Sequence, residues 1–539
     1  MTPAFDRAAH WQRLRQTDVF DLLVIGGGAT GLGVALDAAA RGFAVAVVEA
    51  EDFAKGTSSR ATKLVHGGVR YLAQGQLALV REALHERRTL LDNAPHLARP
   101  LAFVVPAYGF IESAMHRVGL EAYDLMAGKS SLGRTQFLNT RATLDALPGV
   151  RQRGLAGGVR YWDGQFDDAR LAVALARTAA ARGAVVVNHT RATLLLRDGQ
   201  RVAGATVRDE ESGELHHVRA RCVVNATGVW VDRILALDTD PQRVHTAEHR
   251  SIVKPSQGVH LVVDREFMRG ESALLVPKTA DGRVLFAVPW LGKLILGTTD
   301  APRPDMPTEP EPMDNEVAFI LAEAERYLER APRRRDVRSA WAGLRPLVAP
   351  NAAGGAKTKA ISREHTVLVA PSGLVTVTGG KWTTYRAMAE DVLERCMEDG
   401  LLPRRAAGVT NTLRLAGAMS ADAPADRASM SAPPGAHLYG DEAALLASLP
   451  GADRWLWREG EGGLSEAMLR FAARFEMART VEDALARRSR LLFLDARAAH
   501  DVADTAAAIL RDELGLGDVA LGTQAFKALA LRYAHVSSS

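Results

Sequence analysis

Residues 19–50 read VFDLLVIGGGATGLGVALDAAARGFAVAVVEA, and this stretch decides the fold. Its first part, 19–25, is rich in valine, leucine and isoleucine, which predicts a buried strand. A glycine turn follows, and the alanine-rich run over 29–40 then predicts a helix that Gly42 ends. Residues 43–48 predict a second strand. The order strand, helix, strand indicates a βαβ unit of an α/β domain.

Three glycines and one glutamate indicate what this βαβ unit binds. Gly26, Gly28 and Gly31 form G-x-G-x-x-G between strand and helix, where dinucleotide binding requires it. The first permits a tight turn, the second lets a pyrophosphate approach the backbone, and the third lets helix and strand pack closely. Glu49 ends the second strand, where a carboxylate can accept hydrogen bonds from ribose hydroxyls. We therefore predict dinucleotide binding; the alternative is a glycine-rich turn in some other α/β protein.

The composition is that of an ordinary soluble globular protein. The chain has 539 residues, enough for two or three domains and a large core. It is 47% hydrophobic and 24% charged. The formal net charge of +4 is a mild excess, which fits anionic substrates or an anionic membrane surface and does not argue for nucleic acid.

Cysteine usage and hydropathy restrict the cellular setting. With only Cys222 and Cys396, the chain can build neither a disulfide framework nor a cysteine metal cluster, so we expect a reducing compartment and no metal site. Residues 1–16 lack the apolar core of a signal peptide. No run of 18 apolar residues occurs, so we expect any membrane contact to be peripheral.

Two more glycine turns and one hydroxyl-rich loop are candidates for the walls of the same cofactor site. A buried strand over 221–226 runs into Gly228, and a strand over 374–378 runs into Gly380 and then a helix. Helix N-termini at such turns suit negative groups. The loop over 56–63 is rich in small hydroxyls and can wrap a phosphate, although a plain loop is the alternative.

The middle and the end of the chain change character. Four short strands over 254–300, separated by turn residues, predict an antiparallel sheet inserted between halves of the nucleotide domain. Residues 420–434 are rich in alanine, serine and proline and are interpreted as a linker. Beyond them the chain is predicted to be all-helical.

Several motifs together resemble one family, the FAD-dependent glycerol-3-phosphate dehydrogenases of the respiratory type. The segments that carry the resemblance are Gly26–Gly31, Thr57–Ser59, Lys63–Tyr71, Val224–Gly228, Gly297–Asp300, Gly343–Pro346, Gly379–Arg386 and Val481–Arg488. They cover nearly the whole chain. The most specific of them are Lys63–Tyr71 and Gly379–Arg386. Trp382 is a departure, because a small aliphatic residue is expected there; we expect it to affect packing rather than chemistry.

The resemblance implies an α/β fold with a Rossmann-type FAD-binding domain, an inserted antiparallel-sheet substrate domain and a C-terminal all-helical domain. The oxidoreductase region would span 18–400, the linker 420–434 and the helical domain 435–539. Within the first region, the FAD-binding segments would be about 18–95, 160–240 and 355–400, and the substrate segments about 96–159 and 241–354.

The resemblance also implies an activity with its partners. Glycerol 3-phosphate would be oxidised to dihydroxyacetone phosphate, with non-covalent FAD accepting the hydride and ubiquinone or menaquinone taking the electrons. The enzyme would be cytoplasmic and peripheral on the inner face of the cell membrane, with a homodimer as one possible state.

Site residues follow from the motifs and the resemblance. Residues assigned to FAD are Gly26, Gly28, Gly31, Glu49, Thr57, Ser58, Ser59, Lys63, Leu64, His66, Gly228, Gly380, Lys381 and Thr383. A phosphate dianion needs fixed cations, and a C2 hydroxyl needs a base such as neutral histidine. Assigned to catalysis are His260, Arg345 and Lys381, and to substrate binding Arg70, Tyr71 and Arg363.

Two other functions remain open at this stage. A related FAD oxidase of an amino acid or hydroxy acid would return its electrons to oxygen, although four cations near the matching segments argue for a phosphorylated substrate. A flavin-stabilised regulatory or scaffold protein would use the helical tail for interactions, but the candidate cofactor, base and anion sites argue against it.

Overall fold

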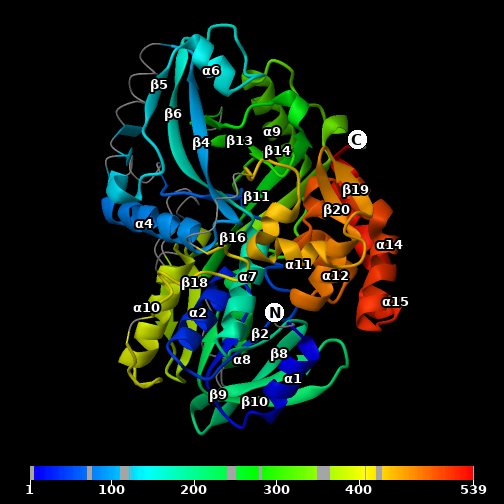
Figure 1. The fold of residues 1–539 in the computed structure, drawn as a ribbon. Coiled ribbons are helices and arrows are strands. Elements are labelled where there is room, and N and C mark those ends of the chain that lie inside the picture. Colours follow the sequence, from blue (N-terminus) through cyan, green and yellow to red (C-terminus); the bar gives the residue numbers. More distant parts are fainter. Residues whose placement is uncertain are drawn as a thin grey trace.

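The computed structural model describes residues 5–537, except 69–75, 110–119, 122, 125, 239–250, 278, 280–281, 349–364, 407 and 421–427. Three parts are visible in Figure 1: a nucleotide-binding domain below, a large sheet above it, and a C-terminal helical part at one side. Among the described residues, no helix combines the length and the apolar character needed to cross a bilayer.

The nucleotide-binding domain is built on a sheet in which β17, β18, β10, β1, β2 and β7 follow one another in space. Neighbouring strands are parallel, except that β17 runs antiparallel to β18. A meander of β8 and β9 continues β10. The bounds are β1 Phe20–Ile25, β2 Val45–Val48, β7 Val185–Val187, β8 Thr190–Asp198, β9 Arg201–Asp209, β10 Leu215–Asn225, β17 His365–Val369 and β18 Leu374–Gly379.

Helices cover both faces of this sheet. Helix α2 packs between α7 and α10 on one face, and α1 lies against β7 and β10 on the other. The bounds are α1 Arg7–Gln16, α2 Ala29–Ala40, α7 Asp168–Ala181, α8 Val231–Asp238 and α10 Tyr385–Glu398. The carboxylate of Asp167 accepts a hydrogen bond from the Arg170 N–H at 3.2 Å and so caps α7.

The inserted sheet has ten strands. Its main path is β15, β11, β14, β13, β12, β4, β6 and β3, with β16 beside β11 and β5 beside β6. The bounds are β3 Leu64–Val65, β4 Ala98–Ala107, β5 Gln136–Leu138, β6 Gly157–Phe166, β11 Val253–Asp264, β12 Ala273–Val276, β13 Leu285–Trp290, β14 Lys293–Gly297, β15 Ala301–Pro302 and β16 Ser339–Val348. Among the helices that border it are α4 Leu77–Asn93, α6 Thr140–Ala146 and α9 Asp314–Tyr327.

This sheet confirms the predicted inserted antiparallel sheet and extends it. The four predicted strands correspond to β11, β12, β13 and β14, and they pair antiparallel. One contact differs, because β12 runs parallel to β4. Strands β4 and β6 were not among the predicted elements, and they bring residues from before the second half of the nucleotide domain into the same sheet.

The C-terminal part is helical, as predicted, apart from one hairpin of β19 Trp455–Glu459 and β20 Gly462–Ser465. Its helices are α11 Ala443–Ala447, α12 Glu466–Phe475, α13 Leu491–Leu494, α14 Ala496–Leu514, α15 Asp518–Leu521 and α16 Thr523–Ala534, with a π-helical turn over Asp483–Arg488. The hairpin forms because glycines at 460, 462 and 463 permit a tight return after a tryptophan-rich strand.

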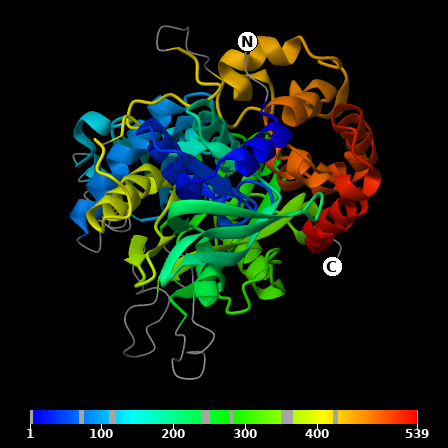
Figure 2. The ribbon, with the colours of Figure 1, turned by 90° about the horizontal axis from the view of Figure 1, so that it is seen from below.

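The C-terminal helices lie beside the nucleotide domain and close to the chain's start. Figure 2 shows them in orange and red, with α1 in dark blue beside them. The Phe5 N–H donates to the Arg474 carbonyl at 3.3 Å. The described end of the predicted linker also packs: Met430 is buried, and its carbonyl accepts the Leu291 N–H at 2.8 Å.

Candidate active site

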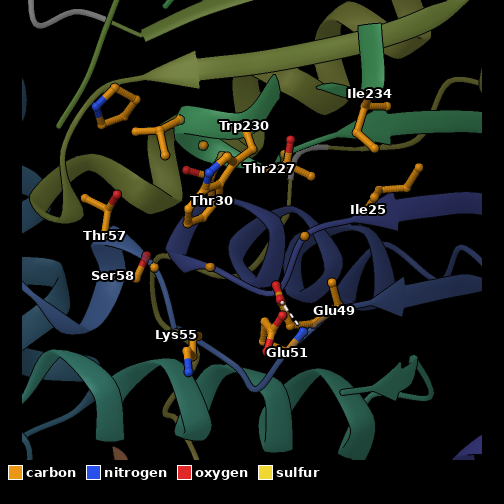
Figure 3. A pocket seen from close by; sticks show the side chains of 18 of the residues that line it. Ile25, Thr30, Glu49, Glu51, Lys55, Thr57, Ser58, Thr227, Trp230 and Ile234 are labelled. Carbon is orange, nitrogen blue, oxygen red and sulfur yellow. Dashed lines mark hydrogen bonds between the residues drawn. The ribbon is translucent and has the colours of Figure 1, made fainter. Parts of the chain in front are cut away.

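The carboxyl ends of the central strands meet above one cavity. Ile25 of β1 lies level with Val48 of β2 and with Asn225 of β10, so the turns that follow these strands converge. Between them is a cavity of about 600 Å³ (Figure 3). It is lined by Gly26, Gly28, Glu49, Thr57, Ser58, Gly228, Gly380 and Lys381, all predicted cofactor residues.

The glycine turn has no room for side chains. Gly26 has φ +116°, and a Cβ there would lie 2.6 Å from the Ala226 carbonyl oxygen. A Cβ on Gly31 would lie 2.0 Å from the Gly26 oxygen, so this third glycine supports the turn from behind and does not line the cavity. The Ala29 N–H donates to Ser58 Oγ at 3.0 Å, which ties the start of α2 to the 57–63 segment.

Glu49 is held in place at the end of β2. Its carboxylate accepts the Gly27 N–H at 2.6 Å and the Glu51 N–H at 2.9 Å. Burial raises the pKa of this carboxyl above its ordinary value, while the two N–H groups oppose that shift. The remaining acceptor capacity of a carboxylate is available to hydroxyl groups in the cavity.

A second cavity of about 210 Å³ adjoins the first. The two share part of their lining, namely Thr57, Pro346, Gly380, Lys381 and Trp382. The smaller cavity also brings together the predicted residues Leu64, His66, His260, Arg345 and Thr383. Side chains from the inserted sheet and from the nucleotide domain therefore face one space.

His260, on β11, lies in a buried wall of this smaller cavity. Its Nε2 is 2.9 Å from Thr62 Oγ1, and its ring stacks on Trp341 with centroids 5.2 Å apart. Burial, with smaller contributions from Lys63 and Arg345, holds the pKa of His260 well below its ordinary value. The imidazole is therefore neutral near pH 7 and able to accept a proton.

Two cations assigned to the site from the sequence line the smaller cavity, and Arg60, which is paired with Glu309 at 2.7 Å, lines it as well. Arg345 Nη2 donates to Thr298 Oγ1 and to the Thr299 carbonyl, each at 3.1 Å, so its guanidinium is fixed. A Cβ on Gly258 would lie 2.3 Å from that nitrogen, so glycine is required beneath it. Lys381 lies at the turn before α10 and lines both cavities.

Some predicted residues lie elsewhere. Ser59 and Lys63 line neither cavity; the buried Lys63 ammonium donates to the Ser59 carbonyl and to Asp168, each at 2.7 Å. Arg70, Tyr71 and Arg363 lie outside the described residues.

Comparison with known proteins now adds to this geometry. A family model described as FAD dependent oxidoreductase matches residues 21–393, and one described as C-terminal domain of alpha-glycerophosphate oxidase matches 408–520. A probable mitochondrial glycerol-3-phosphate dehydrogenase of Caenorhabditis elegans is 41% identical over 527 residues, covering 93% of this chain and 72% of that protein. The chain belongs to the FAD-dependent glycerol-3-phosphate dehydrogenase family.

Two further relatives are described as glycerol-3-phosphate dehydrogenases. The mitochondrial glycerol-3-phosphate dehydrogenase of Homo sapiens is 39% identical over 547 residues, covering 95% of this chain and 73% of that one. Among solved structures, the Bacillus halodurans glycerol-3-phosphate dehydrogenase complexed with FAD has a TM-score of 0.75 at 28% identity, covering 100% of this chain and 99% of that chain.

The dehydrogenase uses FAD, and its larger cavity fits that cofactor. Gly28 lines this cavity at the start of α2, and a Cβ there would lie only 3.1 Å from Ser58 Oγ, so the absence of a side chain keeps the backbone open to a ligand. Backbone N–H groups at such a helix start suit a pyrophosphate, and the fixed carboxylate of Glu49 suits ribose hydroxyls.

The lining residues of the smaller cavity that the sequence did not assign to the site include Arg60, Thr62 and Trp382. Arg60 and Thr62 stand inside the 57–63 segment, between residues assigned to FAD, and that position was the available signal. Trp382 was expected to affect packing only. It lines both cavities, and its Nε1 donates to the Ser58 carbonyl at 2.8 Å.

One cluster outside these cavities has the composition of a metal site. Ligand atoms of Asp52, His189 and Asp483 lie within 4.8 Å of one another. Arg487 and Arg488 donate to Asp52 at 2.5 Å and 2.6 Å, so the acidic groups are already neutralised. We interpret the cluster as an ion-pair network of the dehydrogenase.

Proposed function

We propose that this dehydrogenase oxidises sn-glycerol 3-phosphate to dihydroxyacetone phosphate in the smaller cavity. One observation carries the proposal: a neutral histidine and two cations line a single space that adjoins the FAD cavity. A polyol phosphate needs a base for the hydroxyl and fixed positive charge for the phosphate, and these groups are present together.

Each side chain has a distinct part in the proposed reaction. The guanidinium of Arg345 and the ammonium of Lys381 bind the phosphate and so orient the carbon chain. His260 accepts the proton of the C2 hydroxyl as the C2–H bond breaks. The bound FAD supplies the acceptor for the hydride that leaves C2. The proton and the hydride together account for the two-electron oxidation of the alcohol to the ketone.

The direct test is anaerobic. Purified enzyme with FAD is mixed with glycerol 3-phosphate, and the bleaching of the flavin absorbance is followed, with glycerol as the matched substrate that lacks the phosphate. We expect rapid bleaching with the first and very slow bleaching with the second. Equal rates would contradict a phosphate site, and no bleaching with either would contradict the substrate assignment.

We further propose that the electrons pass to a membrane quinone, ubiquinone or menaquinone, and that the enzyme attaches peripherally to the inner face of the cell membrane. The mild positive charge supports attachment to anionic lipid. Turnover with glycerol 3-phosphate should be faster with a soluble quinone than with oxygen alone. Oxygen uptake equal to the quinone rate would instead favour an oxidase.

Attachment is tested separately by flotation with vesicles. We expect binding to vesicles that contain phosphatidylglycerol and release in high salt, since salt screens surface charge. Binding that survives high salt would show hydrophobic insertion, and no binding to either kind of vesicle would contradict a membrane-bound acceptor.

The alternative function, oxidation of an amino acid or hydroxy acid by oxygen, has weaker support. The family shown by the relatives is that of glycerol-3-phosphate dehydrogenases, and this is what argues against the alternative, since Arg345 in the smaller cavity suits a carboxylate as well as a phosphate.

A further inference from the structure

Arg490 is a cation of the C-terminal part that lies deep inside the molecule. It stands between the π-helical turn and α13, has φ +65°, and its side chain is 0% exposed. A non-glycine residue in the left-handed region is uncommon, and a buried arginine is costly unless it is well paired. This position is therefore held by specific contacts.

Those contacts reach across to the nucleotide domain. Nη2 donates to the Ser59 carbonyl and to Asp168 Oδ1, each at 3.0 Å, and Nη1 donates to the Ala486 carbonyl at 2.9 Å. The guanidinium also lies 4.3 Å from the Phe493 ring centroid. A single planar group thus joins the C-terminal part to the back of the 57–63 segment.

Lys63 and Asp168 complete the same cluster. Lys63 donates to the Ser59 carbonyl at 2.7 Å, the acceptor that Arg490 also uses. Asp168 Oδ2 accepts the Ala61 N–H at 3.1 Å. The backbone of the segment is therefore held from behind at Ser59 and at Ala61.

The front of this segment carries contacts to both cavities. Ser58 Oγ accepts the Ala29 N–H at the start of α2, and Thr57 Oγ1 donates to the carbonyl of Leu344, next to Arg345. Thr62 Oγ1 lies 2.9 Å from His260 Nε2. Any displacement at the back of the segment moves groups beside the pyrophosphate turn and the candidate base.

We propose that Arg490 is a positioning residue of the dehydrogenase: through Ser59 and Asp168 it fixes the 57–63 segment, and so holds Thr62 against His260. The inference rests on the proposed function, because it assigns an effect on that reaction. The C-terminal part then helps to position active-site residues. Among the described residues, none from that part lines either cavity.

The chemistry of the cluster explains why arginine is needed. Ser59 and Asp168 are reached from one nitrogen, while the opposite nitrogen holds the Ala486 carbonyl. A lysine ammonium can donate to several acceptors around one point, as Lys63 does, but it lacks the planar fork that reaches Ser59 and Asp168 from one nitrogen and Ala486 from another. Removing the charge also leaves Asp167 and Asp168 with less compensation in a buried site.

The test compares Arg490→Met and Arg490→Lys with a control at Arg177. Arg177 is a matched residue, because it is buried and forms a two-point ion pair with Glu442 of the C-terminal part, at 2.7 Å and 2.6 Å, and these contacts do not involve residues 57–63. For each variant we would measure bound FAD, melting temperature, hydrogen exchange of peptides over 57–63, and flavin reduction at saturating glycerol 3-phosphate.

We expect Arg490→Met to exchange faster over 57–63 and to reduce its FAD roughly 10- to 100-fold more slowly, since a misplacement near 1 Å is enough for such a loss. Arg490→Lys should lie between this variant and wild type. Arg177→Met should lower the melting temperature without changing either readout. Thr62→Val, which leaves the buried cluster intact, should slow reduction without faster exchange.

Clear outcomes would overturn the proposal. It is wrong if the Arg490 variants keep wild-type reduction and exchange, or if Arg177→Met slows reduction as much as they do. If Arg490→Met does not fold, Arg490→Lys decides by the same criteria. If wild type does not reduce its FAD with glycerol 3-phosphate, the proposed function fails, while the exchange data still decide whether Arg490 fixes the segment.

Discussion

His260 stands where a positive charge is unfavourable. It is 2% exposed, stacked on Trp341, and near the charges of Lys63 and Arg345. The same surroundings lower the proton affinity of the ring, so its unprotonated form persists at mildly acidic pH, below the usual histidine range.

The first prediction concerns this base. Since its pKa is well below 6.5, kcat/KM should fall only as the pH drops below that value, through the lowered pKa. His260→Gln should lower kcat by about 10²- to 10⁴-fold without loss of FAD. A pH profile of kcat/KM for both proteins checks this. An acid limb that persists unchanged in the variant would assign the base to another residue.

The second prediction concerns Arg345. Arg345→Ala should lower kcat/KM for glycerol 3-phosphate by roughly 10- to 150-fold, the value of one charge-assisted hydrogen bond of about 1.5–3 kcal/mol. Arg345→Lys should not restore full activity, because it lacks the planar fork. Parallel assays with glycerol decide the role: an equal loss toward both substrates would mean that Arg345 serves folding or FAD.

The position of a site residue could be predicted where a local motif determines it. It could not be predicted where it depends on a partner that is distant in the sequence. The turns at Gly26, Gly228 and Gly380 each follow a strand, and all three line the larger cavity. Lys63 was expected at the cofactor, but its ammonium is directed to Asp168, and no local pattern reveals a partner so distant in the sequence.

At the scale of elements, the turn from β1 to α2 has little room for an added side chain. The third prediction is that Gly31→Ala abolishes FAD binding, because the added methyl would lie 2.0 Å from the Gly26 carbonyl and must displace the turn. Released flavin per chain is the measurement. Gly515→Ala, in open space on the surface at a positive φ, is the control for a general cost of losing glycine. Normal flavin content in Gly31→Ala would contradict the fit of the cavity.

Helix α1 is joined to strand β7 by a hydrogen bond that depends on pH. The Val186 N–H of β7 donates to His10 Nδ1 at 3.2 Å, which requires an unprotonated nitrogen. Burial, and then Arg13, lower the pKa of His10 to about 4. The unfolded chain binds this proton below about pH 6.5, whereas the folded chain does not until about pH 4.

The fourth prediction follows from the downward shift of the His10 pKa on folding. Stability is lost as the pH falls from 6.5 towards 4, by up to about 1.4 kcal/mol per pH unit for this one proton. His10→Gln keeps an acceptor but cannot be protonated, so urea unfolding at pH 7 and pH 5 should differ less in the variant. The same difference in both proteins would show that other groups, such as the buried His96, account for it.

Element types were predictable where periodicity was strong. The strand, helix, strand order over 20–48 is as expected, since the glycine turn and Gly42 mark the ends of its helix. The pairing of β4 with β12 and β6 was not predictable, because its paired residues are far apart in the sequence, from Ala107 with Gly157 to Phe103 with Ala273. The hairpin of β19 and β20 is short and was missed within a helical region.

At the scale of the whole molecule, the FAD cavity is formed by segments that are far apart in the sequence. Its lining comes from residues 25–58, 190–237, 308–346 and 377–382, so a molecule bound there contacts segments from most of the chain. The fifth prediction is that removing FAD lowers the melting temperature. Adding it back should stabilise by about 2.7 kcal/mol at 100 times its Kd.

Thermal unfolding at graded FAD concentrations measures this. The melting temperature of the wild type should rise with the logarithm of the FAD concentration, and Gly31→Ala should not respond. A melting temperature independent of FAD in the wild type would mean that the cavity residues do not bind the cofactor in the folded state.

The order of the strands in the central sheet bears on how the protein is made. Strand β1 is flanked by β2 and by β10, and β10 in turn by β18, which ends at Gly379. Synthesis at 5–20 residues per second brings that strand out of the ribosome only after most of the chain has been made, and Arg490 follows later still. A nascent chain therefore exposes an incomplete sheet with unpaired strand edges, and prematurely terminated products should be captured by chaperones rather than loaded with flavin.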